Sequence, residues 1–430
     1  MGALAENAVR EVPAHAAIEL FDTLLARYGK GDLQVRLWDG SACGAGQPRC
    51  TLVIKHPDVV RRMCDCPNEQ ALGEAYVCDE FDIKGDIGTA LEFGDSLFRQ
   101  EFPLADRLRI AALLRRLPAG GRLRLLRPAL RLHGWLHSKE RDREAIRYHY
   151  DLPTEFYALW LDPRLVYSCA YFQTPQDDLE AAQVRKLDYI CRKLRLCRGE
   201  RLLDIGCGWG ALVLHAAEHY GVDALGITLS ARQAEVAGER IRASGLATTR
   251  CHVELRDYRD LEGREQFDKI ASVGMFEHVG KKLLPEYFAR AWQLLKPGGV
   301  FLNHGIAYSA TWPLPKPSFS DTYVFPDGEL APINESLRAA EIGGFEVRDV
   351  ESLREHYTLT LKRWVHRLEE HAEQARRITN DSTYRIWRLY MAGSAHRFAS
   401  GRVNIYQTLL AKPEHGDSRL PLARDDWYRE

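Results

Sequence analysis

A short glycine-rich segment in the middle of the chain constrains the fold more than any other feature. Residues 201–205 have the apolar pattern of a buried strand, and Gly206, Gly208 and Gly210 follow at alternate positions. A helix-compatible segment, residues 211–220, comes next. A strand, a tight turn and a helix in this order are typical of a doubly wound sheet, in which glycines let a ligand approach the backbone closely.

The spacing of these glycines narrows the class of ligand. It is G-x-G-x-G, whereas dinucleotide-binding turns have G-x-G-x-x-G, and the Gly-Lys-Ser/Thr of a phosphate-binding loop is missing. A nicotinamide dinucleotide and ATP are therefore disfavoured. The segment fits S-adenosylmethionine, a nucleoside cofactor without a phosphate, and we expect that cofactor here.

Strands and helices alternate from residue 201 onward. The expected strands are 201–205, 223–227, 251–255, 268–273 and 299–304, and the expected helices are 211–220, 230–243 and 282–295. Residues 296–299 are expected to form a turn; after Glu329, a helix and the segment 345–350 should complete the sheet, and two amphipathic helices should close the chain. This alternation predicts an α/β fold with a doubly wound, mostly parallel Rossmann-like sheet that binds ligands at the carboxyl ends of its strands.

Composition is that of an ordinary globular protein. The 430 residues are 45% hydrophobic and 28% charged, which suits two or three domains. No apolar run approaches the ~20 residues of a spanning helix, and the amino terminus does not resemble a signal peptide. We therefore expect a cytoplasmic protein. The ten cysteines contain no C-x-x-C pair, which predicts free thiols and no metal, with a zinc site among residues 43–78 as the alternative.

Four segments are predicted along the chain. They are a small α+β amino-terminal domain (1–105), a basic leucine-rich helical linker (106–147), a catalytic domain (148–412) and a polar tail (413–430). Within the linker, residues 118–121 are expected to separate two helices, and the charged run 139–147 to lead into the catalytic domain.

The net charge of −1 hides an uneven distribution. From Arg107 to Lys139 there are nine Arg or Lys residues and no Asp or Glu, interleaved with leucines. Such a segment either packs as a solvated helical face on a neighbour or binds an anionic membrane surface. Nucleic acid is disfavoured because no reading motif is present. We expect peripheral association with the inner face of a membrane; a homodimer is left open.

Polar residues end two strands of the predicted sheet. Asp204 ends the first, where we expect it to hydrogen-bond near the charged amino-acid moiety of the cofactor; the alternative is a turn or capping acid. The second strand ends at Thr228, where many nucleotide-binding folds place an acid for the ribose hydroxyls. Because no acid stands there, Thr228 and Gln233 would supply neutral hydrogen bonds.

Six motifs between about 145 and 365 together resemble one family. They are Tyr148–Leu152 (YHYDL), Tyr167–Phe172 (YSCAYF), Leu202–Gly210 (LLDIGCGWG), Gly226–Ser230 (GITLS), Gly274–Gly280 (GMFEHVG) and Phe301–His304 (FLNH). The chain resembles the cyclopropane-fatty-acid synthases and the related mycolic-acid cyclopropane synthases and fatty-acid methyltransferases. Residues 73–76 and 82–83 also resemble the extra amino-terminal domain of full-length bacterial synthases.

The resemblance implies a class I methyltransferase fold and two sets of site residues. Beyond the glycine turn with Asp204, Thr228 and Gln233, the implied cofactor site includes Tyr167, Ser168 and an adenine edge at Tyr258 and Arg259. A bicarbonate ion is implied to be held by Cys169, Glu277, His304, the backbone of Ile306 and Tyr357, with Tyr150 orienting Glu277. Without the resemblance, Cys169 would be interpreted as a small buried residue of the core. Tyr357 would be interpreted as an aromatic residue that packs at the start of a helix.

The implied activity is transfer of a methylene group from S-adenosylmethionine to a cis double bond in an acyl chain of a membrane phospholipid, with bicarbonate as the base. An alternative is methyl transfer that gives a methyl- or methylene-branched chain without ring closure. Two further alternatives are a small-molecule amine methyltransferase and a non-catalytic lipid-binding protein. The first needs no bicarbonate site, and the second would have lost Glu277 or the glycines.

Overall fold

A computed structural model describes residues 2–65, 68–119, 132–150, 152–246, 250–312 and 318–428. The chain divides into two compact units. The first comprises Met1–Ala129, Pro317–Phe319 and Asn380–His396, and the second comprises Leu130–Lys316, Ser320–Thr379 and Arg397–Glu430.

The first unit is a small α+β structure around a four-stranded sheet of order β2-β1-β3-β4. Its strands are β1 (Leu33–Arg36), β2 (Ala42–Gly44), β3 (Cys50–Ile54) and β4 (Phe81–Gly85). Its helices include α1 (Gly2–Tyr28), α2 (Pro57–Asp65), α3 (Glu69–Val77), α4 (Ile87–Arg99) and α5 (Leu104–Arg115). Strands β1 and β3 are parallel and the other pairs are antiparallel. The predicted α+β class of this region is confirmed.

A late helix, α16 (Asp381–Ala399), also contributes to the first unit. Arg388 donates hydrogen bonds to the hydroxyl of Tyr76 (2.9 Å) and to the carbonyl of Ile83 (3.1 Å). Arg385 forms an ion pair with Asp82 (3.2 Å). Residues 380–396, which fall inside the predicted catalytic range 148–412, therefore group with the amino-terminal residues.

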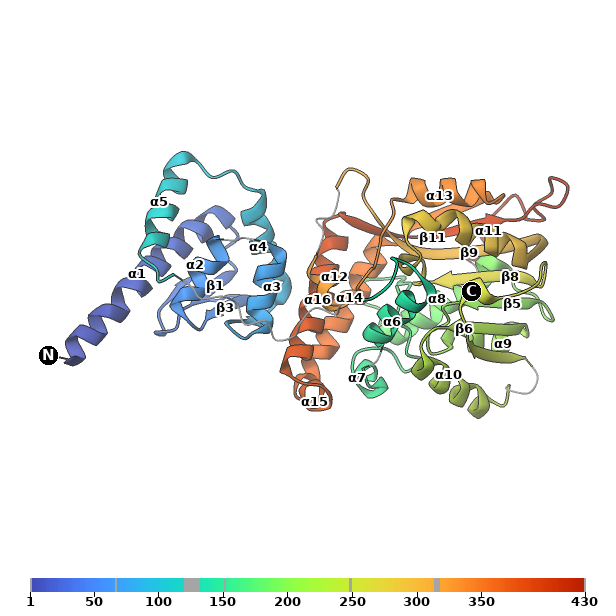
Figure 1. The fold of residues 1–430 in the computed structure, drawn as a ribbon, viewed down its shortest axis with the longest axis horizontal. Helices are drawn as coiled ribbons and strands as arrows, with labels where there is room; N and C mark the ends of the chain where they lie inside the picture. The colour runs from blue at the N-terminus through green and yellow to red at the C-terminus, as the bar shows by residue number, and fades with distance from the viewer. Residues whose placement is uncertain are drawn as a thin grey trace. The chain divides into compact units, whose positions relative to one another are not determined.

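The second unit contains a seven-stranded sheet of order β10-β11-β9-β8-β5-β6-β7 (Figure 1). Its strands are β5 (Arg201–Ile205), β6 (Asp223–Thr228), β7 (Cys251–Leu255), β8 (Phe267–Val273), β9 (Leu295–Tyr308), β10 (Glu346–Ser352) and β11 (Val403–Ala411). The five from β9 to β7 are parallel, and β11 runs antiparallel between β9 and β10. The doubly wound, mostly parallel sheet is confirmed, whereas β11 was not predicted.

Helices cover both faces of this sheet. Those that pack on its strands are α8 (Leu179–Leu194), α9 (Ala211–Tyr220), α10 (Ala231–Ser244), α11 (Leu284–Leu294), α13 (Ile333–Ile342) and α14 (Arg354–Glu370). The other helices in this part of the chain are α6 (Lys139–Tyr150), α7 (Thr154–Ala158), α12 (Phe319–Tyr323) and α15 (Ala372–Ile378). One core cluster joins the sheet to α8 and α9 through Leu187 and Val213, and another joins it to α11 and α13 through Phe288 and Ala340. Burial of both faces explains why the central parallel strands β5, β6 and β8 are rich in apolar residues.

Three local expectations are wrong. Residues 139–147 are not a linker: they belong to α6, which turns Ala145 and Ile146 inward while most of its charges stay at the surface. Residues 296–299 do not form a separate turn, because β9 begins at Leu295 and includes them, with a shift of register against β8. Trp427, inside the predicted polar tail, is buried against the second unit. Of the basic segment, residues 120–131 lie outside the described residues.

Candidate active site

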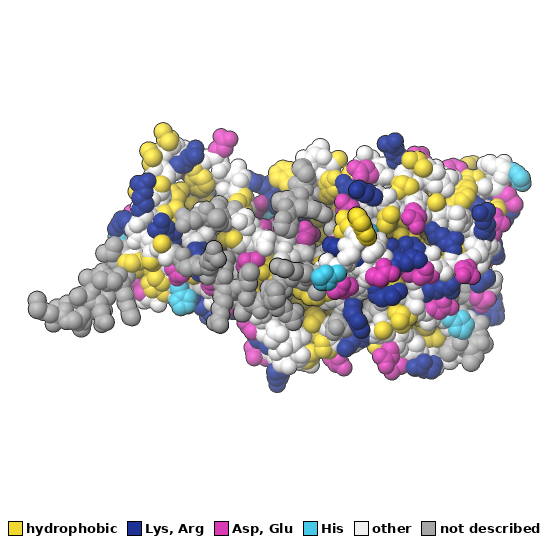
Figure 2. All heavy atoms as spheres, in the orientation of Figure 1, with side chains coloured by type: hydrophobic (Ala, Val, Ile, Leu, Met, Phe, Trp, Pro, Cys, Tyr) yellow, Lys and Arg dark blue, Asp and Glu magenta, His cyan; other side chains and the backbone are white. Residues whose placement is uncertain are grey.

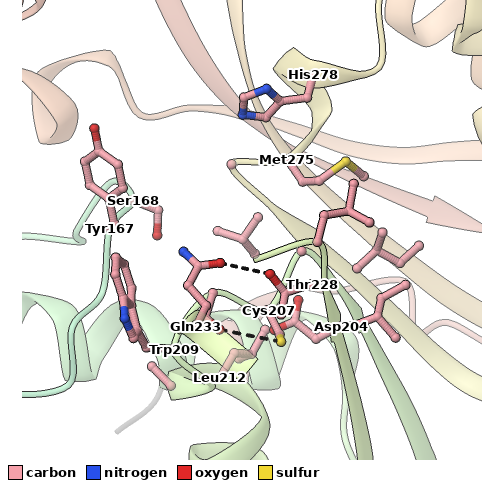
Figure 3. Close-up of a pocket in the computed structure, with 18 of the residues that line it drawn as sticks. Tyr167, Ser168, Asp204, Cys207, Trp209, Leu212, Thr228, Gln233, Met275 and His278 are labelled. Atoms are coloured by element: carbon pink, nitrogen blue, oxygen red, sulfur yellow. Dashed lines mark hydrogen bonds between the residues drawn. The ribbon is translucent and has the colours of Figure 1, made fainter. Parts of the chain in front are cut away.

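A pocket opens at the carboxyl ends of β5, β6 and β8 (Figure 3). It encloses about 1110 Å³ of empty space, including the part open to solvent. The glycine turn after β5 forms one side, with Trp209 and Leu212, and Met275 and His278 come from the segment after β8. The strand ends of a doubly wound sheet are where such folds bind nucleoside ligands.

The glycines of the turn are required for different reasons. Gly208 has a φ of +54°, and a Cβ there would meet no protein atom within 4 Å, so it would project into free space. Because Gly208 lines the pocket, that space is the part a ligand can occupy. Gly206 has a φ of +84°, and a Cβ there would lie 2.6 Å from the Cβ of Met275. Gly210 precedes α9 and does not line the pocket.

Nine of the ten residues predicted for the cofactor line this pocket. They are Tyr167, Ser168, Asp204, Gly206, Gly208, Thr228, Gln233, Tyr258 and Arg259. The hydroxyl of Thr228 donates to Oε1 of Gln233 at 2.9 Å, which fixes both side chains at the end of β6 (Figure 3). The end of β6 therefore presents neutral polar groups to the pocket, as the sequence predicted.

Arg259 is held by acids of the chain itself. In the 3-10 helix η1 (Tyr258–Asp260), its guanidinium forms ion pairs with Asp257 (2.6 Å) and Asp142 (2.9 Å). It also donates to the carbonyl of His137 at 3.1 Å. These contacts tie η1 to α6 at the wall of the pocket.

Asp204 is a buried acid on the pocket floor. It is 2% exposed, and its Oδ1 atom has no hydrogen-bond partner among the described residues. Burial raises its pKa to about 7, and the charge of Lys186 lowers it in part. An oxygen left unsatisfied in such a place costs free energy unless a ligand donor reaches it. An ammonium group of a bound ligand would supply that donor, so the pocket fits an S-adenosyl cofactor.

Glu277 lies beside the pocket in the 3-10 helix η2 (Phe276–His278). Its Oε1 accepts a hydrogen bond from the backbone N–H of Ile306 at 2.7 Å. That N–H is available because the ladder between β8 and β9 ends at Val273 and His304, where Gly274 donates to the His304 carbonyl. Oε2 of Glu277 has no partner among the described residues. Burial raises the pKa of this carboxyl to about 7.

His304 is completely buried on β9. Neither ring nitrogen has a hydrogen-bond partner among the described residues, and burial holds the pKa of the imidazole well below its ordinary value. Directly opposite on β11 stands Gln407, also fully buried, with both amide atoms unpartnered. Gln407 was not predicted, because the strand that carries it was not recognised.

Cys169 and Tyr357 complete the predicted ion site. Cys169 is fully buried, its Sγ lies 3.8 Å from the carbonyl of Leu353, and burial raises the pKa of the thiol far above its ordinary value. Tyr357 is 8% exposed and packs its ring against Trp364 and Phe398. None of the five residues predicted to hold the ion lines the described pocket. Their role as an ion site stays a prediction.

Tyr150 lines the cofactor pocket, with its ring against Tyr167 and Trp209. Its expected role in orienting Glu277 stays a prediction. The described cysteines are all free, and the described residues contain no group of three His, Cys, Asp or Glu side chains that could hold a metal ion. No described helix is long and apolar enough to cross a membrane.

The parallel sheet, the glycine turn and the pocket at its strand ends define a Rossmann-like class I methyltransferase. The family model described as mycolic acid cyclopropane synthetase matches residues 137–408. The chain belongs to this family of S-adenosylmethionine-dependent methyltransferases.

Similar proteins include lipid-modifying enzymes. The chain is 40% identical over 403 residues to a probable fatty acid methyltransferase of Pseudomonas putida, covering 92% of this chain and 96% of the relative. It is 34% identical to the cyclopropane-fatty-acyl-phospholipid synthase of Escherichia coli K12, covering 85% and 89%. A solved mycolic acid cyclopropane synthase, CmaA1 complexed with SAH and CTAB, matches with a TM-score of 0.59 at 34% identity, over 62% of this chain and 97% of that one.

Proposed function

We propose that the protein transfers a methylene group from S-adenosylmethionine to a cis double bond in an acyl chain of a membrane phospholipid and closes a cyclopropane ring. The observation that carries this proposal is the state of Glu277. One carboxyl oxygen is fixed by the N–H of Ile306, and the other is buried without a partner. Its pKa of about 7 suits a group that accepts a proton near neutral pH.

The chemistry requires such a group. The π electrons of the double bond form a carbon–carbon bond to the sulfonium methyl, and the carbon–sulfur bond breaks with its electrons on sulfur. The other alkene carbon becomes a cation. A C–H bond of the new methyl then breaks, its electrons close the ring, and its proton leaves. Without a base beside the cation, the ring cannot close.

The residues around Glu277 fit a small oxyanion. His304 is neutral because burial depresses its pKa, and Cys169 keeps its proton because burial raises the pKa of the thiol. Neutral donors can hold an anion without neutralising its basicity, and the unpartnered atoms of Glu277 and His304 need ligands. Bicarbonate, when bound, would supply the base. Cys169, Glu277, His304, Ile306 and Tyr357 would hold it, and Glu277 or His304 would receive the proton.

Helix α5 supports action at a membrane surface. Leu104 and Leu108 are 70% and 64% exposed, Arg107 and Arg115 are exposed on the same helix, and Arg116 is exposed directly after its end. Figure 2 shows basic and hydrophobic side chains next to one another over this part of the first unit. Exposed leucines beside cations match the requirements of an anionic lipid surface. We propose peripheral binding of the cytoplasmic face of the membrane through α5.

Methyl transfer without ring closure is the second candidate. It is favoured by the relative that is 40% identical over 92% of this chain and is named a probable fatty acid methyltransferase. Both reactions pass through the same cation and use the same site, so the residues present do not separate them.

Purified protein incubated with labelled S-adenosylmethionine and vesicles of unsaturated phospholipid tests the proposal. We expect label in the acyl esters, a high-field cyclopropane signal by NMR, and a rate that falls when bicarbonate and carbon dioxide are removed. A branched acyl product would favour the second candidate. A cyclopropane product at an unchanged rate without bicarbonate would overturn the role of the ion.

A further inference from the structure

Helix α8 carries two buried lysines, Lys186 and Lys193, seven residues apart and therefore on one face. Their exposed fractions are 2% and 0%. A buried ammonium group is costly unless an anion compensates it. Lys193 has such partners, because it forms ion pairs with Glu351 and with Asp349 (3.7 Å).

Lys186 has no such partner in the described part of the chain. No carboxylate there forms an ion pair with it, and its Nζ donates a hydrogen bond to Oγ of Ser168 at 3.0 Å. The ordinary way to stabilise a buried cation is a bound anion. The buried acids Asp162 and Asp204 act on Lys186 only through longer-range charge interactions. A fully buried lysine without a direct ion pair therefore leaves a place for an anionic group that arrives with a ligand.

The position of Lys186 identifies the ligand. Its side chain lines the cofactor pocket together with Ser168 and Asp204. Asp204 has an oxygen without a donor, and Lys186 has no anionic acceptor, yet the two side chains do not form an ion pair with each other. The pocket floor thus presents one cation without an ion-pair partner and one acid without a hydrogen-bond donor. The amino-acid portion of S-adenosylmethionine carries one carboxylate and one ammonium group.

We propose that Lys186 is a cofactor-binding residue whose ammonium pairs with the carboxylate of S-adenosylmethionine, while Asp204 accepts from its amino group. Because Ser168 accepts from Lys186, its own hydroxyl proton is free to be donated to the same carboxylate. Lys186 thereby sets specificity for a ligand that retains its amino-acid portion. This inference rests on the cofactor assignment in the proposed function.

A rival anion is the small ion proposed beside Glu277. The charge of Lys186 also acts on the Cys169 thiol and the His304 imidazole, so the lysine is within electrostatic reach of both sites. Geometry favours the cofactor, because Lys186 lines the cofactor pocket while Cys169 and His304 do not. The two anions make different predictions for binding in the absence of bicarbonate.

Calorimetry with two ligands separates these roles. S-adenosylhomocysteine contains the carboxylate, and 5′-methylthioadenosine lacks the amino-acid portion. For Lys186→Met, we expect the affinity for S-adenosylhomocysteine to fall about 30-fold or more, as for loss of one partner from a buried charge pair. The affinity for 5′-methylthioadenosine should change less than about threefold. Lys186→Arg, which keeps the charge, should retain part of the preference for the longer ligand.

Lys193→Met is the matched control: it removes a buried lysine of the same helix whose charge is already paired within the chain. It should lower the melting temperature but leave both affinities unchanged. Equal losses for both ligands in Lys186→Met would show a structural role and overturn the proposal. Unchanged affinities with an increased requirement for bicarbonate would assign Lys186 to the small ion instead. Failure of the wild type to bind S-adenosylhomocysteine would refute the cofactor assignment itself.

Discussion

At the scale of single residues, burial decides what the catalytic groups can do. Glu277 keeps a proton up to about pH 7 because its ionised form loses hydration, and the N–H of Ile306 compensates only in part. The same burial keeps His304 neutral. A carboxyl that is destabilised when charged contributes to function at the expense of folding stability.

Glu277→Gln should lower turnover and raise the stability of the fold at alkaline pH. The folded-state pKa of about 7 lies above the ordinary value of 4.5, so ionisation of Glu277 destabilises the fold as the pH rises through 7. At pH 8 the variant should be more stable than the wild type by up to about 3 kcal/mol, whereas below about pH 4, under both pKa values, the two should melt alike. Turnover should fall at least about 100-fold with S-adenosylhomocysteine affinity intact. A variant that is less stable at pH 8 would show that the buried charge is compensated.

Alanine at Gly208 and alanine at Gly206 should have different effects, because the first occupies space for the ligand and the second collides with the protein. Gly208→Ala should reduce S-adenosylhomocysteine affinity at least about tenfold, because its Cβ enters the pocket, while the left-handed backbone costs about 1 kcal/mol. Gly206→Ala should mainly destabilise the fold, since its Cβ would meet Met275 at 2.6 Å. Calorimetry and thermal melting would separate the two effects. Unchanged affinity in a folded Gly208→Ala variant would contradict the placement of the cofactor.

At the scale of elements, the regular βα units were predictable and the exceptions have physical causes. Strand β5 and helix α9 follow from apolar periodicity and the glycine turn. Strand β11 was not predicted because it follows three helices, α14 to α16, and pairs with β9, which is remote from it in sequence. Helix α6 was predicted as a linker because most of its residues are charged or polar and only a few, such as Ala145 and Ile146, are apolar and buried. Site residues within motifs could be named from the sequence, but Lys186 and Gln407 could not, because a single polar residue in a helix or strand gives no sign of burial.

Substitutions of two neighbouring residues of β11 test whether the strand contributes to catalysis. Gln407 stands opposite His304, and the neighbouring Thr408 points to the other face of the sheet, opposite Asn303. Gln407→Leu should lower turnover about tenfold or more without changing S-adenosylhomocysteine affinity, because the group facing His304 is lost. Thr408→Val should leave turnover within about twofold. Equal turnover in both variants would exclude Gln407 from the reaction.

At the scale of the whole molecule, α5 is proposed to bring a water-soluble cofactor site to a substrate held in a bilayer. Replacing Arg107, Arg115 and Arg116 with Gln should weaken binding to anionic vesicles by up to about 100-fold, at ~1 kcal/mol for each cation near the surface. The difference should shrink as salt shortens the Debye length from ~10 Å at 0.1 M to ~3 Å at 1 M. S-adenosylhomocysteine affinity should be unaffected.

The control for this experiment removes equal charge from the other unit. Arg198, Arg242 and Arg377 are exposed there, and their replacement with Gln should leave vesicle binding within about threefold of the wild type. Equal weakening in both triple variants would indicate a general charge effect and exclude α5 as the specific contact.

Transfer of deuterium from the cofactor to the lipid distinguishes ring closure from simple methylation. With S-adenosylmethionine carrying a trideuterated methyl group and vesicles of unsaturated phospholipid, ring closure removes one deuteron from the transferred carbon. The account predicts acyl chains that carry a cyclopropane methylene with two deuterium atoms, identified by mass and by NMR. An unsaturated chain with a methyl branch that retains all three deuterium atoms, an exocyclic methylene without a ring, or unlabelled lipid from protein that binds the cofactor would contradict it.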